Sequence, residues 1–117
     1  MRHDPRAYLW DVQEAVDRIL EFTRGRSLNE YLGDAMLRAA VERQFEIIGE
    51  AVNQLAKVAP TVAQGIPDVG EIVAFRNLLI HGYAGVDHGT VWRTVQDDLP
   101  ALRTRVSELL SELGGAP

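Results

Sequence analysis

The chain has 117 residues, of which 12 are basic and 17 acidic, so its formal net charge is −5; 46% of its residues are hydrophobic and 25% are charged. This ordinary globular composition argues against a disordered chain and predicts a single domain over residues 1–117. With no cysteine and 3 histidines, disulfide scaffolds, thiolate zinc sites and cysteine nucleophiles are excluded, and a multi-histidine metal site is not expected.

The first predicted helix begins at Asp4 and Pro5, an N-cap residue followed by proline in the first turn, and ends near residue 24, before Gly25. Its apolar residues recur at steps of three and four and form one stripe along the helix. Ser27 and Glu30 then match a capping box. His3 precedes the first helix, in a terminus that we expect to fray.

A long second helix is predicted to begin after Asp34, which can cap it, and to end before Pro60. The segment from Pro60 to Pro67 contains Gly65 and two prolines. Glycine and proline both interrupt regular structure, so this segment is predicted to be a loop.

The third predicted helix opens at Asp68 and ends at Gly82, which we expect to adopt a left-handed conformation. A final helix follows Asp87, its expected N-cap, and Pro100 should kink or split it near Asp97–Asp98 because proline lacks a donor and crowds the preceding turn. No strand is predicted. The expected fold class is therefore all-α, an antiparallel bundle of four to five helices joined by short loops.

Charge and hydropathy also bear on where the protein acts. No apolar run approaches the roughly 20 residues that a membrane-spanning helix needs, and the first residues lead into amphipathic sequence rather than an apolar signal core. We therefore expect a cytoplasmic protein. The net negative charge weakens the case for a general nucleic-acid coat, which depends on neutralising phosphates, but leaves room for a local cationic cleft.

The densest group of polar residues lies at the end of the third predicted helix, between Phe75 and Tyr83. At about 100° per residue, Arg76 and Tyr83 lie about 20° apart on a regular helix, and His81 lies about 140° from Arg76. A regular helix would therefore separate Arg76 from His81, whereas a break at Gly82 could gather all three polar heads at one helix end. Imidazole suits proton transfer, and the guanidinium of Arg76 is a fixed cation.

Each of these residues also has an ordinary structural role open to it. Arg76 could pair with Glu71 or Glu50. His81 could cap the helix C-terminus, and Tyr83 could be a half-buried aromatic whose hydroxyl reaches water. Spacing alone does not decide between these roles and a catalytic site.

The run from Arg76 to Tyr83 resembles the HepT branch of the HEPN superfamily, whose hallmark Arg-x4-His-x-Tyr is matched by Arg76, His81 and Tyr83. The flanking segments 47–51 and 98–100 are also similar to this family, so the resemblance covers most of the chain. Arg-x4-His alone occurs by chance in many proteins. The longer run, at the end of the third helix of an all-helical chain of this size, is specific.

The resemblance implies a homodimeric, metal-independent endoribonuclease, the toxin of a type VII-like toxin–antitoxin system, with RNA such as tRNA or mRNA as substrate and no cofactor. Arg76 and His81 would be the catalytic residues of a composite site at the dimer interface. The partner would be an MntA-type nucleotidyltransferase antitoxin that transfers AMP from ATP to Tyr83 and silences the nuclease.

This chemistry is compatible with the residues present. Cleaving RNA without a metal requires a base for the 2′-hydroxyl, an acid for the departing 5′-oxygen and positive charge near the phosphorane. One chain offers a single motif histidine, His81, whereas a two-fold dimer offers two, so one imidazole could act as base and its mate as acid. An AMP group on Tyr83 would place bulk and negative charge beside Arg76 and His81, where it would compete with the substrate phosphate.

Several further residues are weaker candidates. Arg43, Glu46 and Glu50 share one side of the second helix and could line the cleft, although an ion-pair ladder is the commoner arrangement. Asn77 lies one turn before His81 and could orient it or simply face outward. In the last helix, His88 is expected to be exposed in the first turn, and Trp92 is expected in the core rather than as a platform for bases.

Two other classes of function stay open. Some related HEPN bundles resemble substrate-binding partners of small nucleotidyltransferases, so the chain could be a non-catalytic binding module. It could also be a structural bundle whose motif maintains dimer packing. The intact set of Arg76, His81 and Tyr83 favours the nuclease, because a scaffold has no need of this combination.

Overall fold

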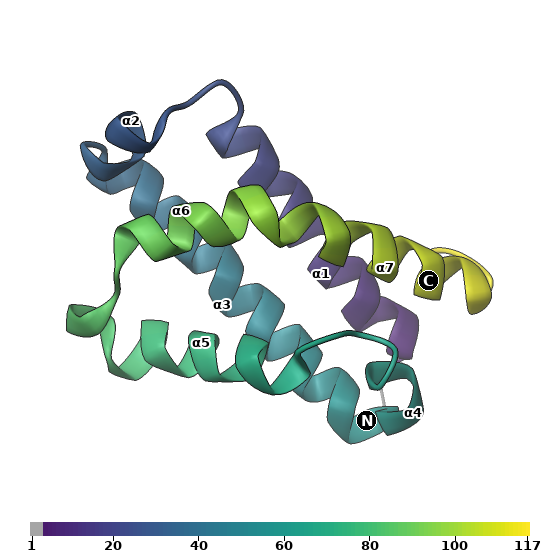
Figure 1. Ribbon diagram of the computed structural model, residues 1–117. Coiled ribbons are helices and arrows are strands. Elements are labelled where there is room, and N and C mark those ends of the chain that lie inside the picture. The colour runs from purple at the N-terminus through teal and green to yellow at the C-terminus, as the bar shows by residue number, and fades with distance from the viewer. Residues whose placement is uncertain (1–3) are drawn as a thin grey trace.

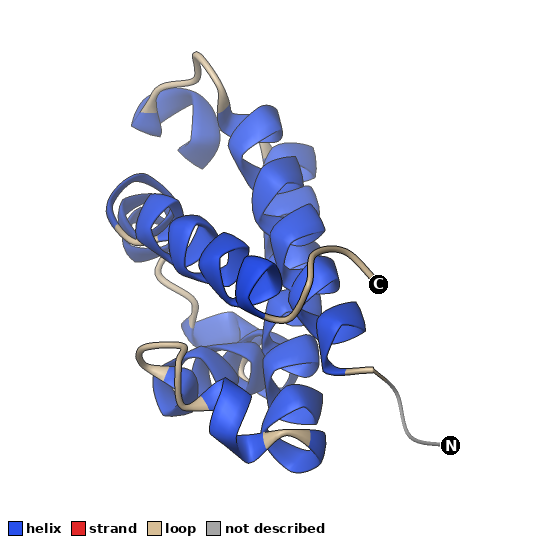
Figure 2. Ribbon diagram, turned by 90° about the vertical axis from the view of Figure 1, so that its right-hand side faces the viewer, coloured by secondary structure: helices blue, strands red, loops and turns tan. Residues whose placement is uncertain are grey.

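The computed structural model describes residues 4–117, which contain helices but no strand (Figure 2). Five helices have ten or more residues, which confirms the predicted all-α bundle of four to five helices. The elements in chain order are α1 (Pro5–Thr23), α2 (Leu28–Leu32), α3 (Ala35–Val58), α4 (Pro60–Ala63), α5 (Val69–His81), the 3-10 helix η1 (Tyr83–Gly85), α6 (His88–Asp97) and α7 (Leu99–Glu112). His3 lies outside the described residues.

The predicted starts of α1, α2, α3 and α6 are confirmed by side-chain caps. Asp4, Asp34 and Asp87 each accept a hydrogen bond from a backbone N–H in the first turn of α1, α3 and α6. Ser27 and Glu30 form the reciprocal capping box at α2. Because these bonds satisfy N–H groups that have no partner within the helix, they fix where each helix begins.

Two prolines, Pro100 and Pro60, determine where helices begin. Pro100 divides the last predicted helix as expected, since α6 ends at Asp97 and α7 begins at Leu99. Pro60, by contrast, begins the short helix α4 inside the segment predicted to be a loop, so that prediction is wrong over residues 60–63. The reason is that proline presets the helical φ angle and needs no N–H at the first helical position.

The left-handed conformation predicted for Gly82 is wrong. Gly82 ends α5, but its φ is −122°, and its N–H donates to the carbonyl of Leu78 at 2.8 Å. The chain continues directly into η1, where the N–H of Gly85 donates to the carbonyl of Gly82 at 2.8 Å, so no left-handed residue is needed. The positive φ lies at the other end of α5, where Asp68 has a φ of 61° and makes no side-chain cap.

The core lies where α1 packs on α3, with α7 against α1 and α5 against α3 (Figure 1). Its fully buried side chains come mainly from α1 and α3, among them Leu9, Val12, Val16, Ile19, Val41, Val52 and Leu55. In contrast, α5 packs mainly on α3, and only Leu79 of its residues is buried. Much of the α5 surface is therefore open. Within residues 4–117, no helix has the length and apolar character needed to cross a bilayer.

Candidate active site

The motif predicted from the sequence lies on α5 and on η1, which follows it. Arg76 and Asn77 are in the middle of α5, His81 is its last residue, and Tyr83 is the first residue of η1. The helix is continuous through His81, so the side chains of Arg76 and His81 leave it about 140° apart.

A glycine on α3 lets α5 approach closely at Arg76. A Cβ atom at Gly49 would lie 2.2 Å from the Cβ and 2.7 Å from the Cγ of Arg76, far inside van der Waals contact. Gly49 itself is buried. The stem of Arg76 therefore occupies the space that a side chain at Gly49 would take.

The Arg76 guanidinium is held by two acceptors. Its Nη2 donates to Oε2 of Glu50 at 2.5 Å, and its Nη1 donates to Oδ1 of Asn77 at 2.8 Å. The Nε atom is buried and has no hydrogen-bond partner among residues 4–117. The Arg76 side chain is 25% exposed and that of Glu50 47%, so the ion pair lies at the edge of the α3–α5 contact, with one face open to solvent.

Glu50 is fixed from a second direction. Its other oxygen, Oε1, accepts a hydrogen bond of 3.0 Å from the side-chain amide of Gln54, one turn further along α3. A carboxylate bound at both oxygens has a defined orientation, so the position of the Arg76 cation is defined as well. Of the two partners expected for Arg76, the structure selects Glu50 and leaves Glu71 apart.

His81 and Tyr83 are both exposed, and Tyr83 retains 75% of its surface. Neither makes a side-chain hydrogen bond or ion pair with any residue from 4 to 117. One protomer therefore brings together Arg76, Asn77 and Glu50, and presents His81 and Tyr83 separately to solvent.

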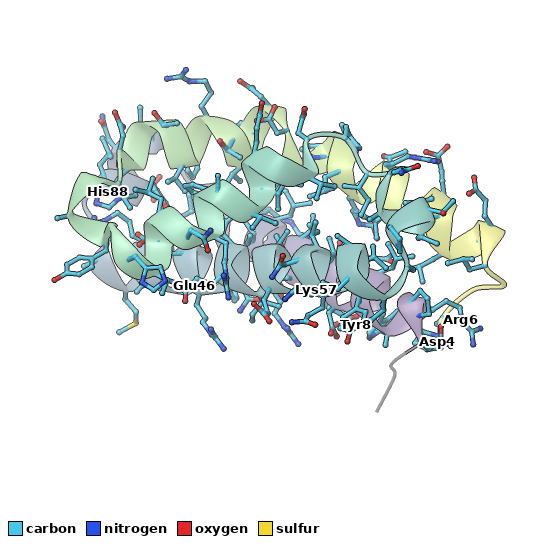
Figure 3. All side chains as sticks on the ribbon, turned by 90° about the horizontal axis from the view of Figure 1, so that it is seen from below. Asp4, Arg6, Tyr8, Glu46, Lys57 and His88 are labelled. Carbon is cyan, nitrogen blue, oxygen red and sulfur yellow. The ribbon has the colours of Figure 1, made fainter. Side chains whose placement is uncertain are left out.

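The other candidate residues named from the sequence either contact Arg76 or form a separate ion pair on α3. Asn77 is exposed and accepts from Arg76, so it contacts the arginine rather than orienting His81. Arg43 pairs with Glu46 at 3.7 Å and is 67% exposed. This pair matches the ion-pair ladder that is the commoner arrangement for such a helix face. Figure 3 labels Glu46 on α3.

A pair of polar side chains beneath the start of α6, His88 and Glu42, was not predicted from the sequence. His88 is half-buried rather than exposed, with its Nδ1 3.8 Å from Oε2 of Glu42 and no hydrogen-bond partner among residues 4–117. It lies at the end of the bundle far from Asp4 and Arg6 (Figure 3).

The aromatic residues beside this cluster belong to the core. Trp92 is half-buried and packs on the edge of the core, against Tyr31 with a ring-centroid distance of 5.3 Å, in agreement with the prediction that it packs on the core. Burial raises the pKa of Tyr31 to about 12, and the carboxylate of Glu42 acts in the same direction. The Tyr31 hydroxyl has no hydrogen-bond partner within the described chain.

Residues 4–117 contain no group of three or more His, Asp or Glu side chains placed to hold a metal ion. The motif thus offers a fixed guanidinium and an exposed imidazole on α5 and an exposed phenol on η1. A guanidinium can bind a phosphate, an imidazole can accept or donate a proton, and a phenol can accept a transferred group.

Comparisons with known proteins relate the chain to ribonucleases. The family model described as Ribonuclease HepT-like matches residues 12–109. The chain is 36% identical over 107 residues to "Putative RNase MJ1380" of Methanocaldococcus jannaschii, a match that covers 90% of this chain and 95% of the relative. It is 37% identical over 109 residues to "Probable ribonuclease HepT" of Thermococcus cleftensis, covering 93% and 98%. No solved structure gives a significant match.

Proposed function

The chain belongs to the HepT-like ribonuclease family, and from this membership we propose that it is a metal-independent endoribonuclease, the toxin of a toxin–antitoxin pair. The observation that carries the proposal is the placement of the family motif on α5. Arg76 is a cation held in place by Glu50 and partly exposed, and His81 is an exposed imidazole at the end of the same helix.

A homodimer completes the site in this proposal. Within one chain, Arg76 and His81 leave α5 about 140° apart, and a single imidazole cannot serve as base and acid in the same step. A two-fold axis near the end of α5 would bring a second Arg76 and a second His81 into the same cleft. The open surface of α5, with Leu78 and Ile80 each 39% exposed, leaves room for such an approach.

The reaction follows from these groups. One His81 imidazole takes the proton of the 2′-hydroxyl, and the 2′-oxygen attacks the adjacent phosphorus. As the P–O5′ bond breaks, the second imidazole gives its proton to the 5′-oxygen, so protons balance and a 2′,3′-cyclic phosphate remains. The Arg76 guanidinium binds the phosphorane oxygens, where negative charge is greatest. The net charge of −5 confines RNA binding to this cleft.

Tyr83 fits the role of an AMP acceptor. A nucleotidyltransferase antitoxin would join the Tyr83 oxygen to the α-phosphorus of ATP and release pyrophosphate. The hydroxyl must reach the active site of another enzyme, and 75% exposure on a 3-10 turn permits this. The added phosphodiester would then compete with RNA for the Arg76 cation.

The alternative is a non-catalytic module that binds a small nucleotidyltransferase. The observation in its favour is that Arg76 is already paired with Glu50 at 2.5 Å, as a structural arginine would be. In that case His81 would have no function in RNA cleavage.

The experiment that separates the two uses protein purified without any partner and shown by intact mass to carry no AMP. The protein and its His81→Ala and Arg76→Ala variants are incubated with bulk tRNA and a mixed mRNA pool in excess chelator. Cleavage by the parent alone, with all three proteins dimeric, is the expected result. Absence of cleavage by any of them, together with tight binding to a nucleotidyltransferase, would favour the binding module.

A further inference from the structure

In Figure 1, α5 lies on one side of α3, and α6 and α7 lie on the other. Residues of these four helices line a groove of about 490 Å³ between them. We call it the α5–α7 groove. Its apolar lining comes from α3, α5 and α7 and includes Phe45, Ile48, Ile72, Phe75, Leu99 and Leu102, whereas α6 contributes the polar residues Thr94 and Asp97. The volume is typical of a site that takes a ligand or a few side chains.

The rim of the groove is acidic. Asp68, Glu71, Asp97 and Asp98 line it, all four are exposed, and no basic residue is among the lining residues. None of the four carboxylates makes an ion pair or accepts a side-chain hydrogen bond from residues 4–117. Asp97 is the last residue of α6, where the helix dipole disfavours an anion. Asp68, Glu71 and Asp98 stand at the N-terminal ends of α5 and α7, where the helix dipole favours an anion, but no basic side chain of residues 4–117 neutralises them.

Charge restricts what can occupy this groove. RNA is disfavoured, because four carboxylates repel phosphates. A second copy placed groove to groove is disfavoured too, because a two-fold contact would set four carboxylates against another four. An apolar floor with an unpaired acidic rim instead complements a chain segment that has apolar residues on one side and Lys or Arg beside them.

We propose that the α5–α7 groove binds a cationic amphipathic segment of another protein, with its apolar side chains in the groove and its basic side chains on the rim. This inference does not depend on ribonuclease activity. Phe75, in the groove wall, and Arg76 are adjacent on α5 and point about 100° apart. A segment in the groove would therefore lie beside the Arg76 face of α5 without covering it.

The test uses a model amphipathic helical peptide of leucine and lysine as the probe, with a scrambled peptide of the same composition and a leucine–glutamate peptide of the same pattern. Affinity is measured by fluorescence anisotropy, and the site by amide chemical-shift changes. We expect the leucine–lysine helix alone to bind and to shift the amides of Ile72, Phe75 and Leu102.

Two groove variants and one matched control sharpen the test. Asp97→Lys reverses a rim charge, and Ala101→Arg adds bulk at an exposed lining position on α7; each should weaken binding by about tenfold at low salt. Glu21→Lys makes the same charge change in the last turn of α1 and should leave affinity within about twofold. Equal losses for Asp97→Lys and Glu21→Lys, or equal binding of the scrambled peptide, would overturn the proposal. The proposal would also be overturned if the protein dimerised without peptide and Ala101→Arg abolished that dimer.

Discussion

Gly49 on α3 lies so close to Arg76 on α5 that a Cβ atom at Gly49 would be 2.2 Å from the Cβ of Arg76. This contact places Arg76 beside Glu50, the next residue on α3, and buries its stem while the guanidinium stays partly open. Glycine in a helix interior costs about 0.5–1 kcal/mol relative to alanine. Here its missing side chain is what allows the ion pair to form at the helix contact.

Gly49→Ala should therefore destabilise the protein, although alanine is the better helix former. The new Cβ forces α3 and α5 apart or displaces the Arg76 stem, and overpacking of this kind costs about 1–3 kcal/mol. The measurement is the free energy of unfolding in urea, and RNA cleavage should fall with it. Gly70→Ala is the matched control, because a Cβ there meets nothing within 4 Å and should be neutral or stabilising. Wild-type stability for Gly49→Ala would contradict the close approach.

Glu50→Gln should tighten RNA binding. Glutamine keeps an acceptor for Arg76 but removes the negative charge that now neutralises it at 2.5 Å, so KM should fall by about three- to tenfold at low salt. Glu50→Ala, which also removes the orienting bond, should lower kcat. Glu46→Gln removes a charge on the same helix that pairs with Arg43 instead, and should change KM less. A KM for Glu50→Gln equal to that of Glu46→Gln would show that Glu50 does not compete with RNA for Arg76.

Stability should fall at high pH because of Tyr31. Burial raises its pKa from 10.0 to about 12, so below pH 10 both the folded and unfolded states hold the proton and the contribution to stability is complete. Between pH 10 and 12 only the folded state holds it, and the free energy of unfolding falls by up to about 1.4 kcal/mol per pH unit. Urea titrations from pH 8 upward measure this slope, which Tyr31→Phe should reduce.

Features that depend on neighbouring residues could be predicted from the sequence. The caps at Asp4, Asp34 and Asp87 are bonds within one helical turn, and side-chain chemistry specifies them locally. The same is true of the division at Pro100. Gly82 shows the limit of this approach, because its φ of −122° depends on the direction of the following chain, which the glycine alone does not determine.

Features that depend on the distance between helices could not be predicted in this way. Gly49 stood in the segment similar to the family, but its contact with Arg76 follows from how α3 and α5 cross. The choice of Glu50 over Glu71 has the same origin, since both were reasonable partners by charge. The half-buried position of His88 follows from the packing of α6 on α2 and from the approach of Glu42 on α3, and the residues near position 88 in the sequence do not indicate either.

Tyr83→Phe should abolish modification without abolishing cleavage. Incubated with the partner nucleotidyltransferase and ATP, the wild type should gain AMP by intact mass and lose nuclease activity. The variant should gain none and stay active, because the hydroxyl accepts AMP but takes no part in the proposed proton transfers. Tyr31→Phe is the control, since a tyrosine with 0% exposure should not be an acceptor. Full modification of Tyr83→Phe would place the acceptor elsewhere.

A site that uses His81 from both chains makes a quantitative prediction for mixed dimers. After subunit exchange, equal amounts of wild type and His81→Ala give about one quarter wild-type dimers, one half mixed dimers and one quarter variant dimers. If one imidazole is the base and its mate the acid, only the wild-type dimers cleave. The initial rate is then about a quarter of that of wild type alone at the same total protein concentration. If each chain cleaves with its own His81, the rate is about a half. Native mass spectrometry confirms that exchange is complete. A rate that varies with the square of the wild-type fraction supports the two-histidine site, and a linear dependence rules it out.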